Sequence, residues 1–318
     1  LPEAADAARA AIAAGVDRVV LTGSAAAGRA VLGQLAPRLV PATMELSGCD
    51  ACLVLAGADL DLAARALAFS LRFNGGATCI APRRVFVPRA LAPDLARRLA
   101  EAVAAGPSRR LEPDEARRIG PLVRDALARG AELIAGRAPD GGDLVGPLVL
   151  AGVDPDARLL REDPFGPVLA LVGVTDEDEA IGLAAACPYA LGASIFGDPR
   201  RARALAGRVP AGVVQVNDLI VPTADPRLPF GGRGASGFGR TRGAEGLLEM
   251  TATKVVMVRG GRARPHYEPL AAEDAAAVAA YLRAAHAGSI AARARGAARL
   301  VRELARGVHR RWRGRMGS

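Results

Sequence analysis

One segment of the 318-residue chain combines a nucleophilic side chain with a flexible backbone. Cys79 lies within residues 73–82, where the pair Gly75-Gly76 lets the backbone approach a substrate closely. A thiol attacks as the thiolate, so its pKa must fall from about 8.5 through backbone donors, cations or a helix end. A single cysteine is more often a small buried hydrophobe. Cys79 therefore becomes a candidate nucleophile only in the context of the other segments.

A second segment, residues 44–50, places the carboxylate of Glu45 among apolar and small neighbours. Burial there would raise its pKa toward that of a useful general base. The alternative is a glutamate that pairs with an arginine at a helix end. Cys49 and Cys52 form a C-x-x-C, but no second cysteine pair or histidine lies near them in sequence. We therefore expect no metal site.

A glycine turn in residues 21–28 follows a short apolar run. Gly23 and Ser24 would end a strand and cap a helix whose first turn contains Gly28. The free N–H groups and the positive dipole end of such a helix bind anions, and the pyrophosphate or adenosine end of a dinucleotide is the functional candidate. The alternative is an ordinary capped turn between a strand and a helix.

Two further segments, residues 162–168 and 228–240, place aromatic side chains among glycines and prolines. They contain Asp163 and Phe165 in the first and Phe230 in the second. Core packing explains aromatic residues in such loops poorly, and rigid loops of this composition usually shape a site.

Apolar runs with strand character alternate with helical periodicity along the chain. Strands are expected over 17–22, 84–87, 168–174, 193–196 and 212–216, and helices over 2–14, 60–71, 91–104, 114–135 and 177–186. This alternation predicts an α/β fold with a largely parallel sheet. One helix, one strand and one helix cannot complete a doubly wound nucleotide domain, so we expect an upstream portion that this sequence lacks.

The charge of the chain is concentrated at its C-terminal end. Residues 1–258 hold 29 basic and 29 acidic side chains, whereas residues 259–318 hold 13 and 4. A neutral body argues against nucleic acid as a partner.

No signal peptide or long apolar run is present, which predicts a cytoplasmic protein. The tail reads as a basic amphipathic helix, which predicts either peripheral contact with an anionic membrane or a solvated helix packed on protein.

Taken in order, these five segments resemble the motifs of the aldehyde dehydrogenase superfamily. Residues 21–28 are similar to its FTGS-x-x-x-G, residues 44–48 to its ELGG glutamate motif, and residues 75–79 to its G-Q-x-C nucleophile motif. Residues 162–168 resemble EExFGPV, and residues 229–240 resemble PFGG-x-K-x-SG-x-GR. The resemblance extends from about residue 16 to residue 258.

The resemblance implies an NAD- or NADP-dependent oxidation of an aldehyde to a carboxylic acid. Cys79 would add to the carbonyl and Glu45 would activate water to hydrolyse the thioester. The cofactor-binding positions would be Gly23, Ser24, Gly28, Asp163 and Phe165, and Asn217 and Phe230 would line the substrate pocket. A homo-oligomer is implied as well, because residues 249–258 resemble a closing strand that usually pairs across a subunit interface.

The resemblance also implies a division of the chain. Residues 1–47 would end a Rossmann-type cofactor domain, 48–235 would form the α/β catalytic domain, 236–260 a return segment with the oligomerisation strand, and 261–318 the basic tail. The family's oxyanion asparagine would lie upstream of Leu1, so we expect this chain alone to bind NAD weakly and turn over poorly.

The chain departs from the family motifs at several positions. Asp163 replaces a glutamate, Ala77 a glutamine, Ser47 a glycine, Cys49 a lysine and Gly234 a lysine. Two alternative functions remain. One is a CoA-acylating semialdehyde dehydrogenase, which Glu45 disfavours because such branches generally lack this base; the other is a catalytically silent structural or binding relative.

Overall fold

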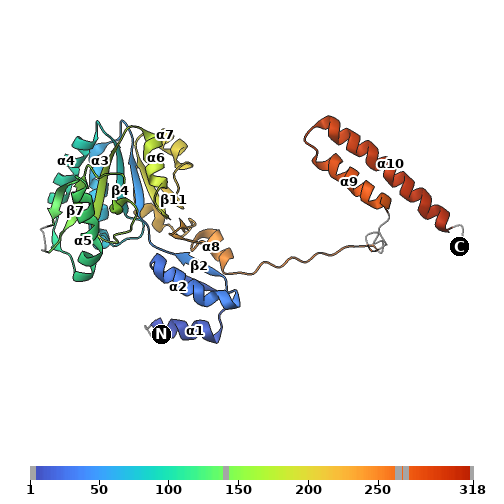
Figure 1. The fold of residues 1–318 in the computed structure, drawn as a ribbon, viewed down its shortest axis with the longest axis horizontal. Helices are drawn as coiled ribbons and strands as arrows, with labels where there is room; N and C mark the ends of the chain where they lie inside the picture. Colours follow the sequence, from blue (N-terminus) through green and yellow to red (C-terminus); the bar gives the residue numbers. More distant parts are fainter. Residues whose placement is uncertain (1–4, 139–142, 262–266, 268–271, 316–318) are drawn as a thin grey trace. The chain divides into compact units, whose positions relative to one another are not determined.

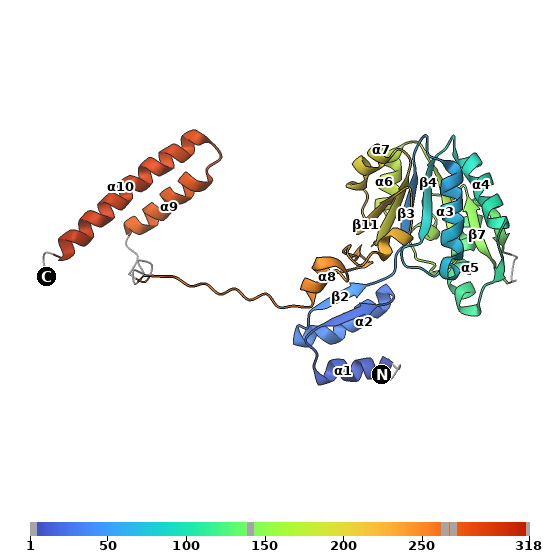
Figure 2. The same cartoon turned by 180° about the vertical axis from the view of Figure 1, so that it is seen from behind.

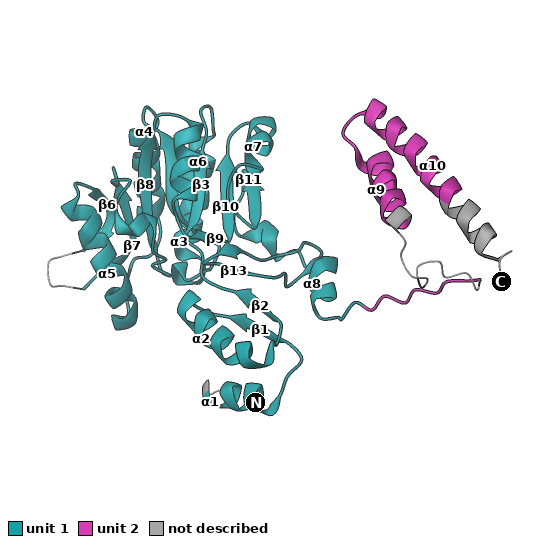
Figure 3. Ribbon diagram, turned by 45° about the vertical axis from the view of Figure 1, so that its right-hand side comes forward, with its two compact units in different colours: residues 1–253 teal, residues 254–318 magenta. Residues whose placement is uncertain are grey.

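The chain divides into two compact units in a computed structural model that describes residues 5–138, 143–261, 267 and 272–315. Unit 1 comprises Leu1–Thr253 and unit 2 comprises Lys254–Ser318, coloured separately in Figure 3. All of the candidate site residues belong to unit 1, so the functional site is a property of that unit alone.

The centre of unit 1 is an eight-stranded sheet in the order β11-β10-β3-β4-β8-β7-β5, with β6 also paired to β7. The strands from β11 to β7 run parallel, whereas β5 and β6 are antiparallel to β7. The strands of this sheet are β3 (Asp50–Val54), β4 (Pro82–Pro88), β5 (Arg109–Arg110), β6 (Glu132–Arg137), β7 (Val145–Ala151), β8 (Val168–Val174), β10 (Gly192–Phe196) and β11 (Val213–Val216).

Helices cover both faces of this sheet, as Figures 1 and 2 show from opposite sides. Side chains alternate between two hydrophobic cores along each strand: Leu169 and Leu171 of β8 pack with one set of helices, and Val168 and Val172 with the other. On the first face lie α3 (Leu60–Arg72) and α4 (Ala92–Ala104), and on the second α5 (Pro113–Ala128), α6 (Glu177–Ala185) and α7 (Pro199–Ala206). The result is a three-layer α/β/α arrangement.

A smaller three-stranded sheet forms the N-terminal part of unit 1, in the order β1-β2-β13. Its parallel strands β1 and β2 are joined by α2, and β13 adds antiparallel to β2. The elements here are α1 (Ala5–Ala14), β1 (Val19–Thr22), α2 (Ala25–Leu35), η1 (Ala36–Arg38), β2 (Ala42–Glu45) and β13 (Gly237–Phe238). This sheet has its own core of Leu35, Met44 and Leu46.

Short elements complete unit 1, among them the antiparallel pair of β9 and β12. They are η2 (Phe73–Gly76), η3 (Arg158–Leu160), β9 (Tyr189–Ala190), η4 (Val221–Ala224), β12 (Arg233–Gly234) and α8 (Gly243–Glu249). Unit 2 contains α9 (Ala272–His286) and α10 (Ile290–Arg315). These helices pack where Gly296 of α10 meets the backbone of Arg283 and Ala284, because a side chain at Gly296 would collide with it. Among the described residues, no helix is both long enough and apolar enough to cross a bilayer.

The predicted α/β fold is confirmed, with two corrections of element boundaries. The helix expected over 114–135 is wrong beyond residue 128, because Gly130 has a φ of 93° and the chain turns into strand β6. The closing strand expected over 249–258 is absent: Glu249 ends α8, and residues 250–258 carry no helix or strand. The apolar side chains of Val255, Val256, Met257 and Val258 are exposed there.

Candidate active site

Glu45 lies at the carboxyl end of β2, where three segments meet. Thr22 of β1 pairs with it on one side and Gly237 of β13 on the other, leaving its side chain only 9% exposed. The Thr241 hydroxyl donates a hydrogen bond of 3.4 Å to Oε1. Burial raises the pKa of Glu45, and the Thr241 contact and nearby arginines oppose that rise. The Glu45 carboxyl group therefore keeps its proton to a higher pH than a carboxyl group in water does.

Cys79 follows an irregular turn after α3. Asn74, Gly75 and Gly76 all have positive φ values, 50°, 62° and 77°, so the chain reverses tightly and leaves Cys79 half-buried. The Glu45 segment lies directly against it, because a side chain on Gly48 would collide with the Cys79 carbonyl oxygen. The fold therefore brings the predicted nucleophile and the predicted base into adjoining loops.

The surroundings of the Cys79 thiol favour its protonated form. Burial raises its pKa to about 11, and the negative charges of Asp50 and Glu45 raise it further. Its own backbone N–H and that of Ile80 oppose the rise by hydrogen bonding. Nucleophilic attack requires the thiolate, which these surroundings disfavour. A base that takes the thiol proton, or a bound cation that lowers the thiol pKa, is therefore needed.

The glycine turn has the predicted geometry. Ser24 caps α2 by accepting a hydrogen bond of 3.1 Å from the Ala27 N–H, and Gly23 N–H donates to the Glu45 carbonyl at 3.0 Å. Gly28 lies one turn into the helix, where a Cβ would be 2.7 Å from the Leu46 side chain. The turn is therefore tied to the segment that carries the base.

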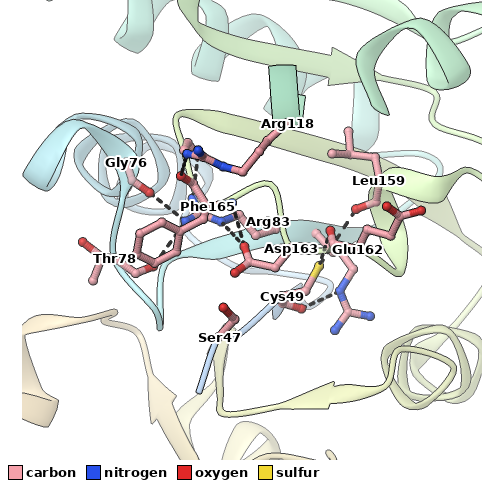
Figure 4. Close-up of polar contacts among 12 residues, drawn as sticks. Ser47, Cys49, Gly76, Thr78, Arg83, Arg118, Leu159, Glu162, Asp163 and Phe165 are labelled. Atoms are coloured by element: carbon pink, nitrogen blue, oxygen red, sulfur yellow. Dashed lines mark hydrogen bonds and ion pairs between the residues drawn. The ribbon is translucent and has the colours of Figure 1, made fainter. Parts of the chain in front are cut away.

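Asp163 and Phe165 lie in the loop between η3 and β8, shown in Figure 4. The Asp163 side chain is only 4% exposed, and its Oδ1 accepts a hydrogen bond of 2.8 Å from the Phe165 N–H. Burial raises the pKa of Asp163, while Arg83 lowers it. Phe165 is 38% exposed with a φ of 40°. Phe165 is thus available to a ligand, whereas the Asp163 carboxylate is directed into the protein.

Asn217 and Phe230 occupy different surroundings. Asn217 Oδ1 accepts from the Gly197 N–H at 2.8 Å and its Nδ2 donates to the Gly197 carbonyl at 2.9 Å, so it fixes the end of β10. Phe230 is buried beneath the Arg242 guanidinium, 4.5 Å from the ring centroid, and packs in the same hydrophobic cluster as Cys79. Its carbonyl accepts a hydrogen bond from Thr241, the residue that contacts Glu45. Phe230 therefore adjoins the Glu45–Cys79 region, whereas the Asn217 amide is bonded to Gly197, and its place in the substrate pocket stays a prediction.

Sequence reasoning missed the buried charges beneath these loops. Asp50, Arg83 and Arg84 are all 3% exposed or less. The sequence signal was present, since adjacent arginines begin a strand that is otherwise apolar, but exposure could not be judged without the fold. Among the described residues, no group of three histidine, cysteine or acidic side chains could hold a metal ion.

The architecture and the site define the class of protein. A half-buried cysteine and a buried glutamate lie on adjoining loops, between a small sheet with a capped glycine turn and a parallel sheet covered on both faces. The family model described as "Aldehyde dehydrogenase family" matches residues 2–256, and the chain belongs to this family.

Individual relatives show the extent of the likeness. The chain is 38% identical to a succinate-semialdehyde dehydrogenase [NADP(+)] of Deinococcus radiodurans over 264 residues, covering 79% of this chain and 55% of the relative. It resembles a crystal structure of an NADP-dependent glyceraldehyde-3-phosphate dehydrogenase from Bacillus halodurans in complex with NADP, with a TM-score of 0.68, 32% identity and coverage of 74% and 51%.

An aldehyde dehydrogenase of Mycobacterium tuberculosis in complex with NAD+ aligns with a TM-score of 0.70 and 29% identity, covering 78% of this chain and 54% of that one. The chain spans about half the length of the curated relatives it matches.

Proposed function

We propose that the protein oxidises an aldehyde to a carboxylic acid with NAD or NADP, through a thioester on Cys79. The observation that carries the proposal is the packing of the Gly48 backbone against the Cys79 carbonyl, which brings Glu45 and Cys79 into adjoining loops. The names of the relatives support an aldehyde substrate and both cofactors for those proteins.

The chain's own residues supply the nucleophile and the base. Glu45, with its raised pKa, accepts the Cys79 proton and frees the thiolate to add to the aldehyde carbonyl. The Cys79 backbone N–H donates to the oxyanion. The cofactor, when bound, supplies the acceptor for the hydride. After Glu45 has released that proton to solvent, its carboxylate takes a proton from water, and the resulting hydroxide hydrolyses the thioester and releases the acid.

The residues present fit one side of a dinucleotide. In the first turn of α2 Ala25 is buried and the Ala27 N–H is bonded to Ser24, but Ala26 and Ala27 are exposed, so this helix end is partly open to an anion; Arg29 is exposed one turn further on. Gly23, Ser24 and Gly28 would lie against this part of the cofactor and Phe165 against its other end. The separate three-stranded sheet supports assigning 1–47 to the cofactor domain, 48–235 to the catalytic domain and 236–260 to the return segment.

Product analysis tests the proposal. The chain is incubated with succinate semialdehyde or vanillin and either cofactor, and reduced nicotinamide and free acid are measured with and without CoA. We expect slow formation of free acid, independent of CoA, and none with Cys79→Ser. A CoA ester as the main product would favour the acylating alternative, in which CoA rather than water cleaves the thioester.

Selective labelling tests the catalytically silent alternative. An aldehyde-mimicking electrophile such as chloroacetaldehyde is applied at neutral pH, and the four cysteines are compared by peptide mass spectrometry. We expect Cys79 to react first, because Cys49, Cys52 and Cys187 are buried. Equal reactivity of all four thiols would support a binding or structural relative.

The tail, residues 261–318, supports a proposal of peripheral contact with an anionic surface. Arg283 of α9 and Arg295, Arg299 and Arg302 of α10 line a groove of about 450 Å³. Val301 and Leu304 are exposed on the same helix, while the side chains of Val308, Arg310, Trp312 and Arg313 lie outside the described residues. The fraction of the protein that sediments with phosphatidylglycerol vesicles should fall at high salt, and it should fall in a variant that lacks residues 259–318. Salt-independent sedimentation would remove this proposal.

The exposed run 255–258 supports a homo-oligomer. Four consecutive apolar side chains in an unpaired segment are typical of a strand that pairs with another chain. Light scattering should show a dimer or larger assembly, and Val256→Asp should shift it toward the monomer. A monomeric unmodified chain would contradict the proposal.

A further inference from the structure

Arg83 is a fully buried cation between the loop that carries Cys79 and the loop that carries Asp163, as Figure 4 shows. It lies at the start of β4, four residues after the candidate nucleophile. Burying a guanidinium costs several kcal/mol unless its donors are satisfied. The hydrogen-bond partners of the Arg83 guanidinium therefore indicate its role.

The contacts of Arg83 join the two loops. Its Nη2 donates to the Gly76 carbonyl at 2.7 Å and to the Thr78 carbonyl at 3.2 Å, in the turn that leads directly into Cys79. Its Nη1 donates to the Gly166 carbonyl at 2.9 Å, next to Phe165. One planar side chain thus fixes the separation of both loops through their backbones.

The loops also touch directly at this point. A Cβ on Gly76 would lie 2.6 Å from the Pro167 backbone, so these two segments of the backbone approach as closely as glycine permits. Arg83 spans this junction and holds the carbonyls on either side of it. The contact and the cation together make the relative position of Cys79 and Phe165 a rigid feature.

The charge of Arg83 opposes the carboxylates around it. Its Nε lies 3.8 Å from Asp163 Oδ1, and it is attracted electrostatically to Asp163, Asp50 and the Cys79 thiolate. The charges of Asp50 and Glu45 disfavour that thiolate. Arg83 therefore provides a buried positive charge of the sign that the nucleophile needs.

The neighbouring arginine provides a matched comparison. Arg84 is equally buried and also donates to backbone carbonyls, but its acceptors are Cys49 at 2.8 Å and Leu183 and Ala184 of α6 at 3.3 and 3.2 Å. None of these three acceptors belongs to the Cys79 loop or to the Phe165 loop. Loss of Arg84 should thus cost folding stability without the electrostatic effect expected of Arg83.

We propose that Arg83 is a positioning residue that fixes the Cys79 loop against the Asp163–Phe165 loop and stabilises the Cys79 thiolate electrostatically. It would act on the reaction only through these loops and touches no reacting atom. Its relevance to catalysis rests on the proposed function, whereas its effect on Cys79 can be measured without substrate or cofactor.

The test is the pH dependence of Cys79 alkylation by iodoacetamide in the 318-residue chain, followed by peptide mass spectrometry. Arg83→Met should raise the apparent pKa of Cys79 by about half a unit to one unit, which slows alkylation at a fixed pH about three- to tenfold. Arg83→Lys keeps the charge and should restore most of the rate. Arg84→Met should leave the Cys79 titration unchanged.

Two outcomes would overturn the proposal. One is an unchanged Cys79 titration in folded Arg83→Met, and the other is an equal shift in Arg84→Met. If Arg83→Met does not fold, Arg83→Lys carries the test: a lysine cannot bridge both loops, so amide exchange at 76–79 and 166–168 should accelerate while the titration stays near wild type. Unaltered exchange would contradict the bridging role. If the chain does not oxidise aldehydes, the alkylation of Cys79 and the amide exchange still test the role of Arg83.

Discussion

At the scale of single residues, the surroundings of Cys79 oppose the charge that its chemistry needs. Glu45 and Asp50 both disfavour the thiolate, and burial raises the thiol pKa to about 11. A proton transfer from Cys79 to Glu45 changes this balance, because the carboxylate that repels the thiolate becomes neutral as the thiolate forms. This relief of repulsion suits a nucleophile that is activated only when its proton is removed.

Glu45→Gln should raise the reactivity of Cys79 toward iodoacetamide at pH 8.5. Removing a negative charge lowers the thiol pKa, so a larger fraction is thiolate and alkylation should be about two- to fivefold faster. Hydrolytic turnover should be lost in the same variant, because the base is gone. Asp50→Asn is the comparison: the charge of Asp50 also opposes the thiolate, so its removal should speed alkylation as well. A slower Glu45→Gln alkylation would contradict the repulsion.

Asp163→Asn should not destabilise the protein at pH 7. A folded-state pKa above the unfolded value means that the fold favours the protonated carboxyl, so its stabilisation is present at low pH and is lost as pH rises through the folded pKa. The amide oxygen can still accept from the Phe165 N–H. The free energy of unfolding, measured with urea, should fall less between pH 4 and pH 7 in the variant than in the wild type. A loss above about 2 kcal/mol at pH 7 would mean that the Arg83 pair outweighs desolvation.

At the scale of elements, the sequence predicted what depends on local pattern. Strand β8 was located at its observed bounds, α3 and α4 within one residue, and Ser24 as the cap of α2, because apolar periodicity and capping side chains act locally. β3 and β7 are not predicted, although they are as buried as β8, because Asp50 begins the first and Gly146-Pro147 interrupts the second. The Glu45–Cys79 pair came from motif order, whereas the inward Asp163 and the bridging Arg83 depend on contacts between distant loops.

Gly76→Ala should separate the loops that flank the site. Its φ of 77° strains any other residue, and a Cβ would also lie 2.6 Å from Pro167 backbone atoms that cannot move independently. Gly57→Ala provides the matched control, with a φ of 78° and open space around the position. Urea unfolding should show a loss of about 1 kcal/mol for Gly57→Ala and at least about 2 kcal/mol more for Gly76→Ala. Equal losses would show that the close approach contributes nothing.

At the scale of the whole molecule, the two units are stabilised by different kinds of packing. Unit 1 buries a large set of aliphatic side chains on both faces of its main sheet. In unit 2 the helices meet at Gly296 with Ala280 buried, while larger apolar side chains such as Tyr281, Leu282 and Ile290 remain exposed. Small residues permit close helix contact but bury little area, so unit 2 alone should be the less stable part.

Lysyl endopeptidase should cut the native chain once, at the boundary of the two units. Lys254 is the only lysine in the sequence, and residues 251–261 are all exposed and carry no helix or strand. A protease needs an extended, accessible backbone, so cleavage of native protein should be within about tenfold of the rate in urea. The fragment that ends at Lys254 should keep the thermal unfolding midpoint of unit 1, since no element of that unit extends beyond Glu249. Protection of Lys254 by more than a thousandfold would show instead that this segment is held in the native assembly, as pairing of residues 255–258 with another chain would require.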